Sequence, residues 1–508
     1  MFRSVSPIQD VFTGNADGGL PDKPVIRRDF SALVAGSAIW MLWSVLAVLI
    51  LDTGYPFSFN QLFSLIAIAG LSGACMRLVS GYLLYRSSFS VVWLVSLVFL
   101  MLPLLLLIKA FSSLYSPFWL FQLAAVSSGV GAVFFPLRTC ITDFSRSTAR
   151  VEQEVRSALA DSGLILAQVL LPVLGFLPLT GWQAVRTLEY SSSHVLGRVG
   201  AGAGFWIVGA LSVFFLVLML AIIRSLPAVF REQRIIYSLL RTLIIYFIVM
   251  LFCLTLVAGF AGVISGVMMS GLLIIAITLF TLQMLFSRIP RGRESGFLPM
   301  LANRKLQLLS LMHLMGAGSL LGFSASLPLL GKELFDLQRV GGEIYRSDPL
   351  GVGILTYIWL LPVIAIIARG ISAWVSRSFK PEKINQFAIG IMLVVSLVLA
   401  ASIDYLSEQH NYGVFFMLAM TFFIGAGLSS GSVFYQIVKA FPPVYMQRIL
   451  IWISGVSSFG VFYIANMFAS QHGVLDPDVI IYGFSVFYVA GFVLNWFFFL
   501  RRHSEMSF

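Results

Sequence analysis

The chain has 508 residues, of which 59% are hydrophobic and only 11% are charged. This excludes a soluble globular protein of that size and indicates a polytopic membrane protein. The formal charge of +11 does not indicate a nucleic-acid-binding protein, because the lysines and arginines lie between apolar segments and form no single basic cluster.

The first 29 residues contain no apolar segment of the kind found in signal peptides, so we expect a short cytosolic tail. Beyond it, fourteen apolar segments are long enough to be membrane spans. They lie near 30–51, 61–85, 89–108, 117–137, 157–179, 203–224, 236–257, 262–287, 306–331, 351–376, 385–404, 412–438, 448–470 and 479–500. An even number of spans places both termini on one side.

The distribution of lysine and arginine predicts which side that is. With fourteen spans, 25 of the 33 basic residues lie on the side of the termini and six on the other side. The remaining two, Arg77 and Arg369, lie inside spans. Because basic loops stay on the cytosolic side, we expect both termini in the cytosol and the protein in the cell (inner) membrane.

The span that contains Arg77 is the first indication of function. Residues 63–85 carry this one charge, and Arg86 follows at the rim, roughly 13 Å further along a helix that rises about 1.5 Å per residue. Arg77 therefore lies near the middle of a hydrocarbon core about 30 Å thick. A charged guanidinium at that depth requires a partner or an aqueous cavity. We expect an anion opposite it.

A weak internal repeat places Arg369 in the matching position. RLVSGYLLYR begins at Arg77 and RGISAWVSR begins at Arg369, and SSGVGAVFF (127–135) is echoed by SSGSVFYQ (429–436). Two related halves are typical of transporters with a binding site at the membrane midplane between the halves. The repeat predicts that both arginines face one cavity.

The predicted fold is all-α, with two pseudosymmetric six-helix halves and two extra central transmembrane helices. The expected divisions are a cytosolic tail (1–29), an N-terminal bundle (30–224), a linker with two extra spans (225–305), a C-terminal bundle (306–500) and a second cytosolic tail (501–508).

Four segments resemble the nitrate/nitrite porters, the NarK-type branch of the major facilitator superfamily. They are residues 39–84, 318–335 (GSLLGFSASLPLLGKELF), 360–377 (LLPVIAIIARGISAWVSR) and 425–441 (GAGLSSGSVFYQIVKAF). The resemblance implies the major facilitator fold and an anion clamped between Arg77 and Arg369.

The resemblance also implies further substrate-binding positions. The glycine-rich nitrate signatures of the family look like residues 158–175 and 425–441 here. The implied substrate-binding residues are Gly163, Gln168, Gly427, Ser430, Gly431 and Ser432.

The sequence departs from the family at several of these places. Asp161 stands where the family has an asparagine, and His313 and Ala317 stand where aromatic residues flank the planar anion. The extra pair of spans is not a family feature either. If transport is coupled to protons, His313 and Asp161 are the candidate titratable groups.

The chemistry of two guanidinium groups suits a small planar monoanion, because each fork donates two parallel hydrogen bonds. Two fixed positive charges also favour exchange, since an empty cavity is costly to rearrange. Each of these residues also has a purely structural explanation. Arg77 can bond backbone carbonyls, and Asp161 can compensate the helix dipole. His313 can be an ordinary buried histidine, and the glycines and serines at 427–432 can serve close helix packing.

The leading hypothesis is a secondary active transporter of nitrate or nitrite that works by alternating access. The alternative is a transporter of another anion such as a carboxylate, possibly proton-coupled. A membrane enzyme or sensor is a third class, but the chain shows no pattern of catalytic groups. Cys75, Cys140 and Cys253 have no metal-ligand spacing. We therefore expect no cofactor, no metal and no nucleic-acid partner, and a monomer in the lipid bilayer.

Overall fold

The computed structural model describes most of the two predicted halves. The described residues are 30–52, 55–111, 116–139, 211–226, 235–260, 274–278, 303–335, 337–340, 343–346, 357–409, 411–471 and 477–501. The predicted span at 157–179 lies outside them, as do the N-terminal tail and nearly all of the C-terminal tail.

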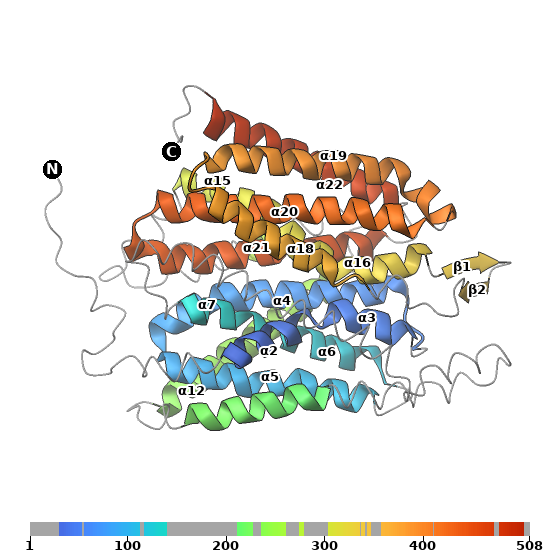
Figure 1. Ribbon diagram of the computed structural model, residues 1–508. Coiled ribbons are helices and arrows are strands. Elements are labelled where there is room, and N and C mark those ends of the chain that lie inside the picture. Colours follow the sequence, from blue (N-terminus) through green and yellow to red (C-terminus); the bar gives the residue numbers. More distant parts are fainter. Residues whose placement is uncertain are drawn as a thin grey trace, which may run out of the picture.

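The first half is built from helices that follow the apolar segments in order (Figure 1). These are α2 (Phe30–Met41), α3 (Trp43–Asp52), α4 (Phe59–Arg86), α5 (Phe89–Phe111), α6 (Phe118–Ser128), the 3-10 helix η2 (Gly129–Val133) and α7 (Phe134–Thr139). The first expected span is bent by 41° between Met41 and Trp43. The long helix α4 starts at a capping box, in which the Ser58 hydroxyl and the Gln61 side chain each bond the other's backbone N–H.

The second half has the same helical character. Its first span is continuous from Arg304 to Phe335 and comprises α15 (Arg304–His313), the π-helix η3 (Leu314–Gly318) and α16 (Ser319–Phe335). The other helices are α18 (Leu360–Val375), α19 (Pro381–Glu408), α20 (Tyr412–Ala440), α21 (Pro443–Gln471), α22 (Pro477–Asn495) and the π-helix η4 (Trp496–Leu500).

A short hairpin is one departure from the all-α prediction. Strands β1 (Leu337–Val340) and β2 (Glu343–Arg346) pair antiparallel, with Leu337 opposite Arg346. The hairpin lies in the connection after α16, where no apolar periodicity indicates an element.

Helix α12 (Ile235–Phe260), the first of the two predicted extra spans, packs on the first half against α4, α5 and α6 (Figure 1). The Tyr246 hydroxyl lies 2.7 Å from the Ser96 hydroxyl of α5, and Arg241 Nη2 donates to the Ser87 hydroxyl at the end of α4 over 2.7 Å. The opposite face of α12 is apolar and exposed, as expected of a lipid-facing surface.

The two halves meet mainly where α4 runs antiparallel to α21 (Figure 1). Phe63 stacks on Phe468 with ring centroids 5.4 Å apart, and further along the seam a Cβ on Gly455 would lie 2.5 Å from Leu78 side-chain atoms. Leu78 follows Phe63 by fifteen positions, a distance of roughly 22 Å along the helix. The halves are therefore closed against each other over much of a bilayer core.

Nine of the described helices are long and apolar enough to cross a membrane, and the bent pair α2–α3 makes a tenth. Leu211–Leu226 and Leu360–Val375 are shorter apolar helices at two further predicted spans. The described part of the chain thus has about ten apolar spans in a helical fold.

Candidate functional site

Arg77 is buried where the two halves meet. Its Nε donates to the Ala132 carbonyl over 3.1 Å and its Nη1 donates to the Ser454 carbonyl over 3.3 Å. The guanidinium carbon lies 4.7 Å from the centre of the Trp40 ring and 5.2 Å from that of Phe135. Ala132 belongs to η2 and Ser454 to α21, so Arg77 joins its own half to the other one. These contacts match the carbonyl-bonded alternative, and direct anion binding stays a prediction.

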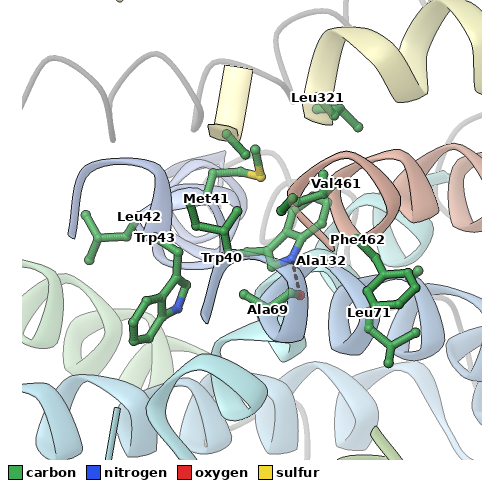
Figure 2. Packing of buried hydrophobic residues seen from close by; sticks show 14 of the residues in the cluster. Trp40, Met41, Leu42, Trp43, Ala69, Leu71, Ala132, Leu321, Val461 and Phe462 are labelled. Carbon is green, nitrogen blue, oxygen red and sulfur yellow. Dashed lines mark hydrogen bonds between the residues drawn. The ribbon is translucent and has the colours of Figure 1, made fainter. Parts of the chain in front are cut away.

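Two tryptophans of the first span fix the surroundings of Arg77. Trp40 Nε1 donates to the Ala69 carbonyl over 2.9 Å (Figure 2), and Trp43 Nε1 donates to the Ser128 hydroxyl over 2.9 Å. A larger residue is excluded at Gly73, because the Trp40 indole occupies the place that its Cβ would take. Both indole donors are satisfied, which lets these large rings lie buried against α4 and α6.

The serines of α21 near Arg77 were not predicted from the sequence. The hydroxyls of Ser457 and Ser458 donate to the Ser454 carbonyl over 3.0 and 2.8 Å, so they share the acceptor of Arg77. All three serines are buried. The run SGVSS (454–458) is visible in the sequence, but only the pairing of α4 with α21 shows that it lies beside Arg77.

Arg369 is equally buried, on α18 of the second half. Its guanidinium carbon lies 5.8 Å from the ring centre of Phe434 on α20, and its charge acts on the His313 ring at the end of α15. Each arginine thus lies over a phenylalanine from the fourth predicted span of its own half. His313 is buried, and its Nδ1 has no hydrogen-bond partner among the described residues.

Two of the three glycines predicted to bind substrate, Gly427 and Gly431, bring α20 close to α18. A Cβ on Gly427 would overlap the Ala365 carbonyl oxygen, and one on Gly431 would overlap the Arg369 carbonyl oxygen. Two glycines four residues apart let the helix backbones touch, as small residues do in membranes. The contacts favour the packing role for these glycines, and they fix the backbone that carries Arg369.

The two predicted serines on α20 differ. The Ser432 hydroxyl donates to the Ser429 carbonyl within the same helix over 3.1 Å. The Ser430 hydroxyl is buried and has no partner among the described residues, and the same holds for both side-chain polar atoms of Gln436. Buried polar atoms without partners are costly, and they commonly mark the place of a water molecule or ligand.

The structure therefore brings the predicted residues of the second half together through α15, η3, α18 and α20, and it brings Arg77 to α21. Asp161, Gly163 and Gln168 lie outside the described residues, as does Cys140. Within the described residues, no group of three or more His, Cys, Asp or Glu side chains has a geometry that could hold a metal ion. Cys75 of α4 and Cys253 of α12 are free thiols in contact with each other.

Comparison with known proteins gives relatives over most of the chain. It is 25% identical to the "Probable nitrate/nitrite antiporter NarK2" of Thermus thermophilus, over 92% of this chain and 90% of that protein. It is 22% identical to the "Nitrate/nitrite transporter NarU" of Salmonella typhimurium (96% and 94% covered) and of Escherichia coli (94% and 93%). No protein-family model matches the chain.

Solved structures with the same fold are transporters of the major facilitator superfamily. The outward conformation of FucP matches with a TM-score of 0.51 at 12% identity, covering 92% of this chain and 98% of that one. The partially occluded, inward-open conformation of XylE from E. coli matches with a TM-score of 0.53 at 11% identity, covering 92% and 95%. This chain thus has the fold of a major facilitator transporter, and its relatives include the probable nitrate/nitrite antiporter NarK2 and the nitrate/nitrite transporter NarU, which are not enzymes.

Proposed function

We propose that the protein is a secondary active transporter that moves nitrate and nitrite across the membrane by alternating access of its two halves. The similarity to NarK2 and NarU supports the substrate class. The observation that carries the proposal is the presence of one buried arginine on the second span of each half, of which Arg77 already donates to a carbonyl of the opposite half.

In this proposal the anion lies between Arg77 and Arg369. Each guanidinium offers parallel N–H donors that match two oxygens of a planar anion. On the second half, the Ser430 hydroxyl and the His313 ring supply polar groups, and the absence of a partner for that hydroxyl and for His313 Nδ1 among the described residues supports that role. Gly163 and Gln168 would complete the site from the first half, and Gly427, Gly431 and Ser432 would shape it.

Arg77 links binding to movement of the halves. Its bond to the Ser454 carbonyl holds α4 against α21. An anion that draws the guanidinium toward itself replaces that bond, so the seam between the halves loosens when the substrate is bound. Without an anion, two buried positive charges make the rearrangement costly, which favours exchange of nitrate for nitrite over movement of the empty protein. Proton coupling would act through His313 or Asp161.

The finer architecture is part of the same proposal. It has fourteen spans, arranged as halves at 30–224 and 306–500 with two extra helices in the 225–305 linker, and both termini lie in the cytosol. The protein works as a monomer in the inner membrane, with the bilayer and a small anion as its partners. The packing of α12 on the first half supports one of the two extra spans.

A counterflow experiment tests the function. Purified protein in vesicles preloaded with unlabelled nitrite is given labelled nitrate, with a panel of carboxylates in parallel. We expect saturable nitrate exchange that is strongly reduced in Arg77→Lys and kept in Arg377→Lys, at an exposed position just after α18. Flux of carboxylates without nitrate supports the alternative substrate class instead. No flux of any of these anions contradicts transport and leaves a sensor as the remaining hypothesis.

A further inference from the structure

A buried chain of polar side chains runs from the outer helix α22 through α19 to α20. Asn385 of α19 donates through Nδ2 to Asn495 Oδ1 of α22 over 3.0 Å, and the Ser429 hydroxyl of α20 donates to Asn385 Oδ1 over 2.8 Å. All three residues have no exposed surface. One amide thus links three helices.

The outer end of this chain is anchored by further bonds. Asn495 Nδ2 donates to the Glu382 carbonyl over 3.1 Å and to Gln386 Oε1 over 2.7 Å, and Gln386 Nε2 donates to the Phe492 carbonyl over 3.1 Å. The two asparagine amides therefore have their carbonyl and amino groups bonded, which fixes their orientation. A fully bonded polar network inside an apolar bundle holds its members in one arrangement.

The inner end of the chain lies directly against the candidate site. Ser429 precedes Ser430, and a Cβ on Gly316 of η3 would lie 2.7 Å from the Ser429 hydroxyl and 2.8 Å from the Ser430 backbone nitrogen. The Ser372 hydroxyl of α18 donates to the Leu428 carbonyl over 2.7 Å. Leu428 and Ser429 of α20 are thus bonded by α18 and α19, and Ser429 and Ser430 lie close to Gly316 of η3.

This arrangement is not needed for helix packing as such. Apolar side chains of similar volume pack at least as well in a bundle core, and buried polar groups are costly unless they are fully bonded. The network instead fixes how α20 is rotated about its own axis, and how far it is shifted along that axis, at residues 428–430. Gly431, which touches the Arg369 carbonyl, is the next residue along the helix.

We propose that Asn385 and Asn495 are positioning residues of the anion site, which hold α20 so that Ser430 and Arg369 meet the substrate. This inference rests on the proposed transport of nitrate. The residues do not touch the anion themselves and act through Ser429.

The test uses the double variant Asn385→Leu, Asn495→Leu, which replaces both amides by apolar groups of similar shape and so preserves packing. We expect KM for nitrate to rise about fivefold to tenfold, the effect of losing roughly one well-placed hydrogen bond, with Vmax close to wild type. The unfolding temperature should fall slightly, because the Ser429 hydroxyl and the Gln386 side chain lose their partners. The milder variant Ser429→Ala cuts only the last link and still folds if the double variant does not. It should raise KM in the same direction by a smaller factor.

The matched control is Ser485→Ala. The Ser485 hydroxyl donates to the Ser396 hydroxyl over 2.9 Å and joins the same helices, α22 and α19, without reaching α20. Its KM should equal that of the wild type. An unchanged KM in both network variants overturns the inference and leaves nitrate transport standing. A rise in the KM of Ser485→Ala as large as that in the network variants has the same consequence. Absence of nitrate flux in the wild type overturns both proposals.

Discussion

Arg77 and Arg369 lie on corresponding helices of the two halves and are buried to the same extent, but their surroundings differ. Arg77 donates to two backbone carbonyls, one from each half, and lies between two aromatic rings. Arg369 lies over one ring and beside His313, in a region where side-chain polar atoms such as the Ser430 hydroxyl have no partner among the described residues.

This difference indicates that the two arginines have different roles in transport. The Arg77 guanidinium bonds one carbonyl from each half, and its bond to Ser454 requires that the two halves are in contact. Near Arg369, the Ser430 hydroxyl has no partner among the described residues, and such an atom commonly marks the place of a ligand or a water molecule. We infer that the group around Ser430 and Arg369 provides most of the binding and that Arg77 converts binding into movement of the halves.

The variant Arg369→Lys should have the largest effect. Lysine keeps the charge but loses the fork, and charge-assisted hydrogen bonds are worth about 1.5–3 kcal/mol each, so nitrate affinity should fall about 10-fold to 100-fold. Equilibrium binding of labelled nitrate to the purified protein measures this. If the nitrate affinity of Arg369→Lys equals that of the control Arg377→Lys, Arg369 does not bind the anion.

Arg77→Lys should have a smaller effect on affinity and a clear effect on the seam. The bonds to Ala132 and Ser454 are lost together, and we expect nitrate uptake to fall by about tenfold or more. The seam is measured by a disulfide between Gly81→Cys and Ile451→Cys, because a Cβ at position 81 would lie 3.2 Å from Ile451 Cγ2. Cross-linking should slow when Arg77→Lys is added. Equal cross-linking rates would show that Arg77 does not hold the seam.

Gly431→Ala tests the close contact between the backbone of α20 and that of α18, the helix that carries Arg369. The added methyl group would overlap the Arg369 carbonyl, and forcing α18 and α20 apart should destabilise the protein by about 1–3 kcal/mol. Gly370→Ala, one residue from Arg369, is the matched control because its Cβ would meet nothing within 4 Å. Thermal unfolding in detergent should separate the two variants, and the same melting temperature in both would contradict the close packing of α18 and α20.

The smallest expected effect concerns α12, which packs on α4, α5 and α6 of the first half. Tyr246→Phe removes one buried hydrogen bond to Ser96 and should cost about 1 kcal/mol of stability. Tyr237→Phe, on the exposed face of the same helix, should cost nothing measurable. If both changes have the same effect on unfolding, α12 does not rest on the first half as described.

The sequence predicted the features that depend on composition along the chain. A lone arginine in an apolar segment is conspicuous, and its repeat at Arg369 identifies the matching helix from the order of residues alone. The resemblance carried by 425–441 led to Ser430 and the glycines beside Arg369. The fold class and the transport class followed from the same features.

The remaining features depend on which helices are neighbours, which periodicity does not encode. Ser454 and the serines after it look like ordinary small residues until α21 is placed on α4. The link from Asn495 to Ser429 joins positions 66 residues apart through a third helix, and the bend after Met41 has no proline to announce it. The hairpin at 337–346 is too short and too polar to show an alternating pattern.

The most direct test is the position of a bound anion. A structure determined in saturating nitrate, with Arg369→Lys as the control, measures the distances from the anion to both guanidinium groups. We predict density within hydrogen-bonding distance of Arg77 and Arg369 together, with Arg77 drawn away from the Ser454 carbonyl, and no such density in the variant. Nitrate bound elsewhere, or two arginines too far apart to share one anion, would contradict it.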